Sequence, residues 1–520
     1  MNWILSLPRL TPLLLLALML PALPAKASPD PEKHAAALFD SLLGQPARLR
    51  ILMRDLPKGA DLHNHLSGAI YAESYIAWAR ESGLCIDIAT HAMSTAHDAA
   101  PCSPGTLPVT DALAHTPGLY NGIIDAFSMR DYMPTPNDAS GHDHFFSSFE
   151  KFDPAGKSHA GEMLAEAANR AAGDHVLYLE LMHYPLVRES AGLGLAHPWH
   201  GEDFAHDFDE IRSFIPALVK EARLRTDLAE TRMRSVLHCG TAQAEPGCSV
   251  KIRYLTQLIR TLPPQAVFAQ MAYSYALVQA DPRFLGINIV APEDNPVALR
   301  DYSLHMRAFR YFSSIYPTVP LTLHAGELTE GLVPPEDLRF HIREAVEVAG
   351  ARRIGHGVDI TYENDPQALL AEMAHRHVAI EINLTSNDEI LGVRGEDHPF
   401  RAYRAAGVPL VLSTDDEGVS RIDLTHEYLR ATLTFGLHYA DLKQLSRNSL
   451  SYSFLPGDSL WTLSGNQLAK PCAGISPGMK VAGPKDQGTC AGLLSRSEKA
   501  RTQWQLEAAF HDFEQKLLRQ

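Results

Sequence analysis

The sequence predicts an α/β protein whose main body is a (β/α)8 TIM barrel, with an N-terminal arm, a lid insertion after the first strand and a C-terminal extension. Three features support this: short apolar runs typical of buried strands, amphipathic helical patterns between them, and polar residues directly after four of the runs. The eight expected strands are Ala60–Leu62, Val176–Leu179, Ser235–Leu237, Phe284–Val290, Leu321–Leu323, Arg353–Gly355, Val378–Ile382 and Leu410–Leu412. From the second strand onward they recur every roughly 25–60 residues, which fits β-α units in a closed barrel better than an open sheet.

The helices expected between the strands show the clearest amphipathic patterns at Asp337–Val348, Leu424–Phe435 and Leu442–Leu450. The first and second strands are separated by an unusually long interval, so we expect a lid insertion at residues 84–160. Within it, Phe145 and Phe149 share one face of a predicted helix. Such a stripe either packs in the core or forms an apolar lid over a small-molecule pocket, and both interpretations stay open.

The first 27 residues have the features of a secretory signal peptide. Arg9 precedes the apolar run Leu13–Leu20, and Ala25-Lys26-Ala27 supplies a cleavage site. The run is shorter than the about 20 residues needed to span a bilayer, so no membrane attachment is expected after cleavage. We therefore expect an exported protein, either periplasmic or secreted.

The rest of the chain divides into an arm at residues 28–56, the barrel at residues 57–456 and an extension at residues 457–520. The arm and the helix expected at Ser495–Leu518 could each brace the barrel or form the contact of a homodimer. The sequence does not decide between these two roles.

Composition excludes several classes of protein. Of the 520 residues, 45% are hydrophobic and 21% are charged, which is typical of a soluble globular protein. The excess of 61 acidic over 46 basic residues gives a formal charge of −15, which argues against binding to nucleic acid. In an exported chain the six cysteines suggest three local disulfides, 85–102, 239–248 and 472–490.

Polar clusters follow four of the expected strands, at the ends that form the mouth of a barrel. They are Asp61–His65, His324–Glu327, Gly355–Gly357 and Ser413–Asp416. Three imidazoles and one carboxylate from these clusters form a set suited to one zinc ion per chain: His63, His65, His324 and Asp415. Three further groups remain available for acid–base chemistry beside the metal: Glu327, His356 and Asp416.

The chain resembles the adenosine deaminase family of metal-dependent amidohydrolases, and its signal peptide and lid insertion resemble the secreted, growth-factor-like branch. The matching stretches, in chain order, are PKGADLHNHLSGAI, FEKFD, GINIVAPED, LHAGE, RIGHG, EINLTSN and STDD, between residues 57 and 416. The combination of HAGE, RIGHG and STDD is highly specific.

The resemblance implies a role for each polar residue. The zinc set would activate water, and His356 would orient that water and take its proton, or would stabilise the hydroxide electrostatically. Glu327 would protonate N1 of a purine, and Asp416 would hydrogen-bond N7. Phe145 and Phe149 would be lid residues that exclude water from the pocket.

Three residues depart from the family pattern. Ser67 replaces the acidic residue that meets the ribose 5′ hydroxyl, Ala291 replaces the glycine whose amide meets purine N3, and Glu417 replaces a proline. We expect hydrolytic deamination of adenosine and 2′-deoxyadenosine, with a purine nucleoside as the small-molecule partner. Two alternatives stay open: the same chemistry on adenine, a modified adenosine or a non-purine amide, and an exported nucleoside-binding or signalling protein.

Overall fold

The computed structural model describes residues 30–95, 102–136, 138–462, 467–476, 479, 481 and 488–519. The expected signal peptide, residues 1–27, lies outside the described residues. The eight barrel strands are β1 (Gly59–His65), β5 (Val176–His183), β6 (Lys251–Ile259), β7 (Phe284–Val290), β8 (Thr322–Ala325), β9 (Arg353–His356), β10 (Ala379–Ile382) and β11 (Leu410–Leu412).

These strands form two parallel sheets, β1-β5-β6-β7 and β11-β10-β9-β8. Single parallel bridges join the sheets at both seams, between Ile287 and Leu321 and between Asn64 and Asp415. The second seam is a short ladder, because the amide of Asp415 donates to His63 O at 2.9 Å and the amide of His65 donates to Asp415 O at 2.9 Å. The result is a closed eight-stranded barrel, as the sequence predicts.

The prediction of the third strand was wrong. Ser235–Leu237 forms the end of the long helix α10 (Ile215–Val236) and its cap, and Leu237 packs against α7 (Ala160–Gly173). The true third strand, β6, begins with charged residues because the C-terminal extension covers that end: Arg253 lies 2.7 Å from Glu498. A charged start hides the apolar alternation that identifies a strand.

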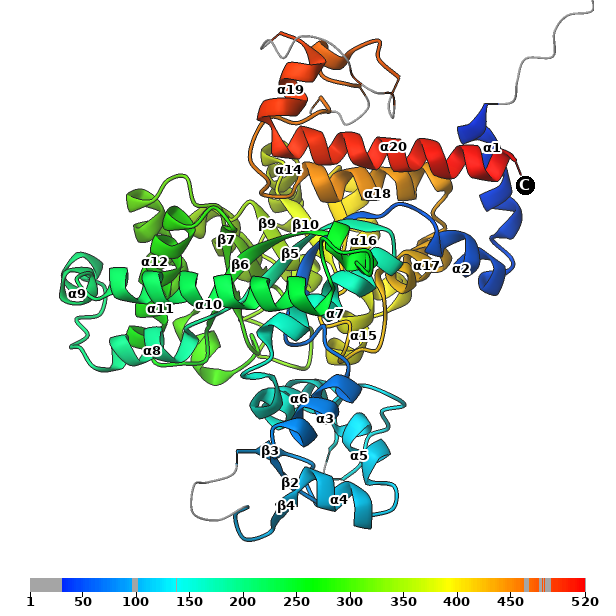
Figure 1. Ribbon diagram of the computed structural model, residues 1–520. Coiled ribbons are helices and arrows are strands. Elements are labelled where there is room, and N and C mark those ends of the chain that lie inside the picture. The colour runs from blue at the N-terminus through cyan, green and yellow to red at the C-terminus, as the bar shows by residue number, and fades with distance from the viewer. Residues whose placement is uncertain are drawn as a thin grey trace, which may run out of the picture.

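Helices surround the barrel (Figure 1). Besides α7 and α10 they are α8 (Val187–Leu195), α9 (Phe204–Ile211), α11 (Pro264–Ala280), α12 (Pro296–Ile315), α13 (His341–Glu344), α14 (Pro366–Arg376), α15 (Leu384–Leu391), α16 (Phe400–Ala406), α17 (Leu424–Phe435) and α18 (Tyr439–Ser451). The helix expected at Asp337–Val348 is shorter, since α13 is followed by a π-helical turn at Ala345–Ala349.

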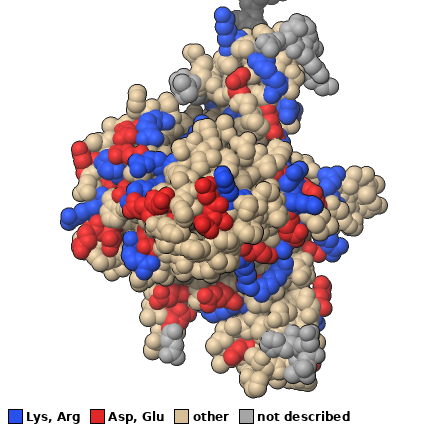
Figure 2. Space-filling model, turned by 90° about the vertical axis from the view of Figure 1, so that its left-hand side faces the viewer, with Lys and Arg blue, Asp and Glu red and all other residues tan. Residues whose placement is uncertain are grey.

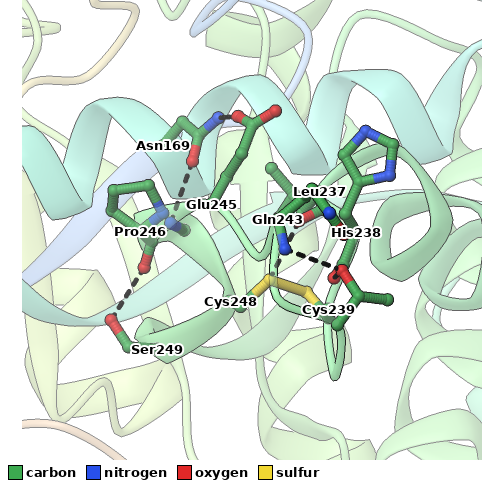
Figure 3. Close-up of a disulfide and its surroundings, with 11 residues drawn as sticks. Asn169, Leu237, His238, Cys239, Gln243, Glu245, Pro246, Cys248 and Ser249 are labelled. Atoms are coloured by element: carbon green, nitrogen blue, oxygen red, sulfur yellow. Dashed lines mark hydrogen bonds between the residues drawn. A yellow bond between two sulfur atoms is a disulfide. The ribbon is translucent and has the colours of Figure 1, made fainter.

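The three predicted disulfides are all formed: Cys85–Cys102, Cys239–Cys248 and Cys472–Cys490. The second closes the loop between α10 and β6, and Figure 3 shows its surroundings. Asn169 on α7 accepts a hydrogen bond from the amide of Gly247 at 2.9 Å, so the loop is tied to the neighbouring helix.

The insertion after β1 forms a lid at one end of the barrel (Figure 1). Its elements are α3 (Ala72–Glu81), β2 (Cys85–Asp87), β3 (Met93–Ser94), β4 (Thr106–Pro108), α4 (Val109–His115), α5 (Leu119–Ala126) and α6 (Gly141–Gly156). The strands form a small antiparallel sheet, β3-β2-β4, closed by the first disulfide. The lid contacts the loops after the barrel strands: the amide of Met129 donates to Val419 O at 2.8 Å, and His142 Nε2 lies 3.0 Å from Asp294 Oδ1.

The arm and the extension lie on the side away from the lid (Figure 1). They contain α1 (Pro31–Leu42), α2 (Pro46–Arg54), α19 (Cys490–Arg496) and α20 (Glu498–Leu518). The buried Lys58 ammonium binds both to the end of α2, at Met53 O (2.8 Å), and to Asp174 O (2.8 Å) after α7. On the other side, Lys443 of α18 lies 2.6 Å from Glu514 of α20, so both terminal segments are fixed to the barrel.

Acidic and basic side chains are interspersed over the face shown in Figure 2. Within the described part of the chain, no helix combines the length and the apolar character that crossing a bilayer requires.

Candidate active site

Four side chains converge at the lid end of the barrel, from three different strand ends. His63 and His65 lie on β1, His324 lies on β8, and Asp415 follows β11. The Nε2 atom of His324 lies 3.1 Å from that of His63 and 3.2 Å from that of His65. The Oδ1 atom of Asp415 lies 3.2 Å from each of the two β1 nitrogens.

This spacing fits a zinc ion. Tetrahedral zinc with bonds of about 2.0–2.1 Å places neighbouring ligand atoms about 3.3 Å apart, close to the distances found here. Asp415 Oδ1 is buried and has no hydrogen-bond partner among the residues that the structure describes, whereas its other oxygen accepts from Ser386 at 2.6 Å. Burial opposes ionisation of Asp415, but the neighbouring histidine rings, His63 first, hold its pKa well below the usual value. The site therefore contains an anionic oxygen that faces the Nε2 atoms of His63 and His65 at 3.2 Å and accepts no hydrogen bond from the described residues.

Each histidine of this set is oriented by a second contact at its other ring nitrogen. His63 Nδ1 lies 2.6 Å from Glu381 Oε2, and His65 Nδ1 lies 2.9 Å from Gln257 Oε1. The corresponding partner of His324 is Asn288 Oδ1, 2.8 Å from its Nδ1. Because these oxygens accept hydrogen bonds, each ring carries its hydrogen on Nδ1 and directs the Nε2 lone pair toward the space between the four side chains.

These three supporting residues were not predicted from the sequence. Asn288 and Glu381 lie within the stretches GINIVAPED and EINLTSN, and Gln257 lies on the strand that was misplaced. The signal that could have found them is a polar residue in an otherwise apolar strand, since such a residue needs a buried partner.

Glu381 belongs to a buried ionic network beneath the histidines. Its Oε1 atom accepts from Thr322 at 2.8 Å and from the Arg353 guanidinium, which also donates to Glu180 at 2.7 Å. Burial opposes ionisation, but Arg353 and His63 hold the pKa of Glu381 at about 2. His63 is thus supported by a carboxylate that remains charged at any physiological pH.

Two further carboxyl groups lie beside the histidines, and their pKa values are raised where that of Glu381 is lowered. Burial, together with the negative charge of Asp415, raises the pKa of both Glu327 and Asp416 well above the usual range. Both are nearly inaccessible to solvent, and within the described ranges nothing hydrogen-bonds to Asp416 Oδ1. Both carboxyl groups are therefore biased toward the protonated form, in which each can donate a hydrogen bond.

The turn that carries Glu327 is held from below by Glu293. Its two carboxylate oxygens accept from the amides of Gly326 (3.1 Å) and Glu327 (2.9 Å). Its charge is maintained by Arg260, 3.6 Å away, and by His341 at 2.6 Å. Burial opposes this, but the net effect lowers the pKa of Glu293 to about 2.

Two glycines allow close approaches that any side chain would block. A Cβ atom on Gly68 would lie 1.5 Å from Asp416 Oδ1, and one on Gly355 would lie 2.5 Å from His63 Cε1. In contrast, three residues with side chains adopt positive φ at the mouth: Ala291 (83°), His356 (68°) and Asp415 (61°). Such conformations cost about 1–3 kcal/mol each and are concentrated at functional sites.

The remaining predicted site residues lie around the mouth. Ser67 is half-buried at the edge of a cavity of about 670 Å³, and its carbonyl accepts from Tyr75 at 2.7 Å. Phe145 is buried and Phe149 is partly buried on lid helix α6, with ring centroids 5.7 Å apart. Contact of these two rings with a ligand stays a prediction.

The chain is similar to known proteins over this barrel. A family model described as adenosine deaminase matches residues 158–465. The adenosine deaminase of Shewanella loihica is 37% identical over 136 residues, which are 26% of this chain and 38% of that protein. For that of Clostridium perfringens the identity is 36% over 135 residues, which are 26% and 37% of the two chains. The aligned region thus spans less than two fifths of either relative.

A solved structure has a similar fold. The apo structure of the N6-methyl-AMP deaminase from Arabidopsis thaliana superimposes with a TM-score of 0.50 at 18% identity, covering 78% of this chain and 94% of that one.

Proposed function

Because the chain belongs to the adenosine deaminase family, we propose that it is a zinc-dependent hydrolase that converts adenosine and 2′-deoxyadenosine to the inosine products and ammonia. The observation that carries this proposal is the pairing of two proton-donating carboxyl groups, Glu327 and Asp416, with a three-histidine, one-aspartate donor set. A protein that only binds a nucleoside has no need of a proton donor beside a metal site.

The two carboxyl groups match the two ring nitrogens of a purine. Both N1 and N7 are hydrogen-bond acceptors, so each requires a donor, and a protonated carboxyl group supplies one. In our proposal Glu327 protonates N1, which withdraws electrons from C6, and Asp416 donates to N7, which fixes the ring. The raised pKa of each group favours the protonated form that these roles require.

His63, His65, His324 and Asp415 would hold the zinc, whose chemistry is to make water a nucleophile at neutral pH. His356, on the same face of the site, would hydrogen-bond the oxygen that attacks C6. The oxygen of water bonds to C6, and the two protons of water are passed on, one to the amino group and one to Glu327, which has given its own proton to N1. The C6–N bond then breaks and the amino group leaves as ammonia.

A specific observation keeps a second substrate class open. Ser67 has a neutral, short side chain where the family pattern has an acid, and it borders a cavity of about 670 Å³. With the ribose directed toward Ser67, as the family pattern implies, the cavity would leave room for a larger group, so a modified adenosine is our alternative substrate, and adenine or a non-purine amide follows if no nucleoside reacts.

We also propose that the protein is exported. This rests on the basic start, apolar run and Ala25-Lys26-Ala27 site of residues 1–27. Extracting the protein from cells and determining its N-terminus tests this: a chain beginning at Ser28 is expected, and an intact N-terminus would contradict export by this signal.

The experiment that tests the activity is ammonia release from a panel of adenosine, 2′-deoxyadenosine, adenine and 5′-substituted adenosines. Activity should disappear after chelation and return with zinc. Turnover of adenosine that survives complete metal removal would refute the zinc proposal, and no release from any aminopurine would refute deamination.

The role of Glu327 has its own test. Glu327→Gln should retain zinc but lower kcat by at least about a hundredfold, the usual scale for a general acid. The exposed Glu336→Gln serves as the matched control and should behave as the parent protein. Near-normal activity of Glu327→Gln would remove that residue from the mechanism.

A further inference from the structure

A hydrogen-bonded chain of side chains leads from the backbone of α16 to His356 without passing through any proposed zinc ligand. The amide of Phe400 lies 3.1 Å from His398 Nδ1. His398 Nε2 lies 3.1 Å from Asn387 Oδ1, and Asn387 Nδ2 lies 2.8 Å from His356 Nδ1. His356, Asn387 and His398 are all buried, so no solvent is available to exchange for these contacts.

The direction of this chain is fixed at its start. A backbone N–H can only donate, so His398 Nδ1 must accept and the ring hydrogen lies on Nε2. That hydrogen requires an acceptor, which sets the Asn387 amide with its oxygen toward His398. The opposite end of the amide, its NH2 group, therefore faces His356 and donates to it.

The consequence for His356 is a defined tautomer. Its Nδ1 accepts from Asn387, so the ring hydrogen lies on Nε2. A doubly protonated ring would place two donors 2.8 Å apart. A competing acceptor, Glu327 Oε1, lies 3.5 Å from Nδ1, beyond a normal hydrogen bond.

The Nε2–H group points into the active site. It has no hydrogen-bond partner among the described residues, and the Asp415 Oδ2 atom is 3.9 Å away. Its ring stands 5.1 Å from that of His63 and 5.0 Å from that of His324, centroid to centroid. A donor left without a partner in this position is available to a ligand.

We propose that Asn387 and His398 are positioning residues that lock His356 in its Nε2–H tautomer, so that His356 offers the attacking oxygen a hydrogen-bond donor and not a lone pair. The tautomer follows from the protein alone, whereas its use in catalysis rests on the proposed function.

The direct test is 15N NMR of protein labelled in histidine, with and without zinc. The ring resonances of His356, assigned by their loss in His356→Gln, should show a protonated Nε2 and a bare Nδ1. In Asn387→Asp both side-chain oxygens can only accept, so the hydrogen should move to Nδ1. A protonated Nδ1 in the parent protein, or an unchanged tautomer in Asn387→Asp, would overturn the proposal.

A second pair of variants tests the tautomer without the negative charge that Asn387→Asp introduces. His398→Gln retains a donor toward Asn387 Oδ1 and should keep the tautomer, whereas His398→Leu frees the amide to rotate and should produce a mixture. Zinc content and thermal unfolding are measured for all variants, so that loss of fold is recognised separately. Equal tautomer populations in the two His398 variants would overturn the role of His398.

Kinetics test the catalytic use. Asn387→Asp and His398→Leu should lower kcat at least about tenfold with KM changed less than about threefold, because the lost donor acts mainly in the transition state. A flipped tautomer with parental kcat would refute that use while leaving the tautomer assigned. Absence of turnover in the parent protein would instead refute the proposed function, and the NMR result would stand.

Discussion

Replacing Glu381 with glutamine separates support of the metal site from support of the fold. In the parent protein Oε1 accepts from Arg353 and Thr322, while Oε2 accepts from His63. The glutamine oxygen would remain where two donors meet, which leaves the NH2 group facing His63 Nδ1. Two donors would then oppose each other, and the ring would be driven to carry its hydrogen on Nε2, the atom that would bind zinc in our proposal.

The expected loss can be estimated. Changing a group that orients a metal ligand typically lowers metal affinity 10–100-fold, which is about 1.4–2.7 kcal/mol. A second loss is separate: Arg353 is almost fully buried and would keep only one of its two carboxylate partners, so the free energy of unfolding should also fall.

Glu180→Gln is the matched control, because Glu180 contacts the same guanidinium at 2.7 Å but does not contact His63. Zinc affinity is measured by chelator competition, and stability by urea unfolding of the zinc-free proteins. Both variants should lose stability, but only Glu381→Gln should lose zinc affinity at least tenfold. Equal zinc affinities for the two variants would refute the proposed role of the Glu381–His63 contact.

Three other results are expected. Gly355→Ala should lower zinc affinity at least about tenfold by displacing the His63 ring, whereas Gly192→Ala, in open space on α8, should not; chelator competition compares them. Ala291→Gly should raise the free energy of unfolding by about 0.5–1 kcal/mol by relieving a φ of 83°, and an unchanged or lower urea midpoint would contradict this. The pKa of Glu293 is about 2 in the folded protein, against an ordinary value of 4.5 that we take for the unfolded chain. As the pH falls from about 5 toward 2, the unfolded chain therefore takes up a proton that the folded protein does not, and the free energy of unfolding should decrease. Glu293→Gln should make this decrease smaller in urea titrations.

The barrel could be predicted because its strands are buried on both faces and most appear as uninterrupted apolar runs. The exception shows the limit of this signal. Lys251 and Arg253 open β6 because Glu498 of a distant helix neutralises them, at 3.1 and 2.7 Å. An ion pair between residues about 245 positions apart does not affect local periodicity. The short apolar stretch Ser235–Leu237 was therefore predicted as the third strand instead of β6.

The clustering of the candidate site residues could also be predicted from the sequence, but not the residues that orient them. His324 and Asp415 were found because they directly follow strands, where side chains meet at the barrel mouth. Asn387 lies in a helix and His398 in a loop, and their effect depends on which end of an amide faces which ring. Sequence spacing contains no information about that orientation, since a reversed amide has the same sequence.

The backbone at the barrel mouth has positive φ values at His356 and Asp415, two of the candidate site residues. At His356 and Asp415 the backbone leaves the strand direction at the point where the side chain must turn inward, and neither residue is the glycine that such a turn favours. The conformation is maintained by bonds elsewhere: the amide of Asp415 donates to β1, and the ring of His356 is held by Asn387. Hydrogen bonds such as these two offset the backbone strain. We therefore expect substitutions at Asn387 and at the seam between β1 and β11 to alter the positions of the reacting groups before they unfold the barrel.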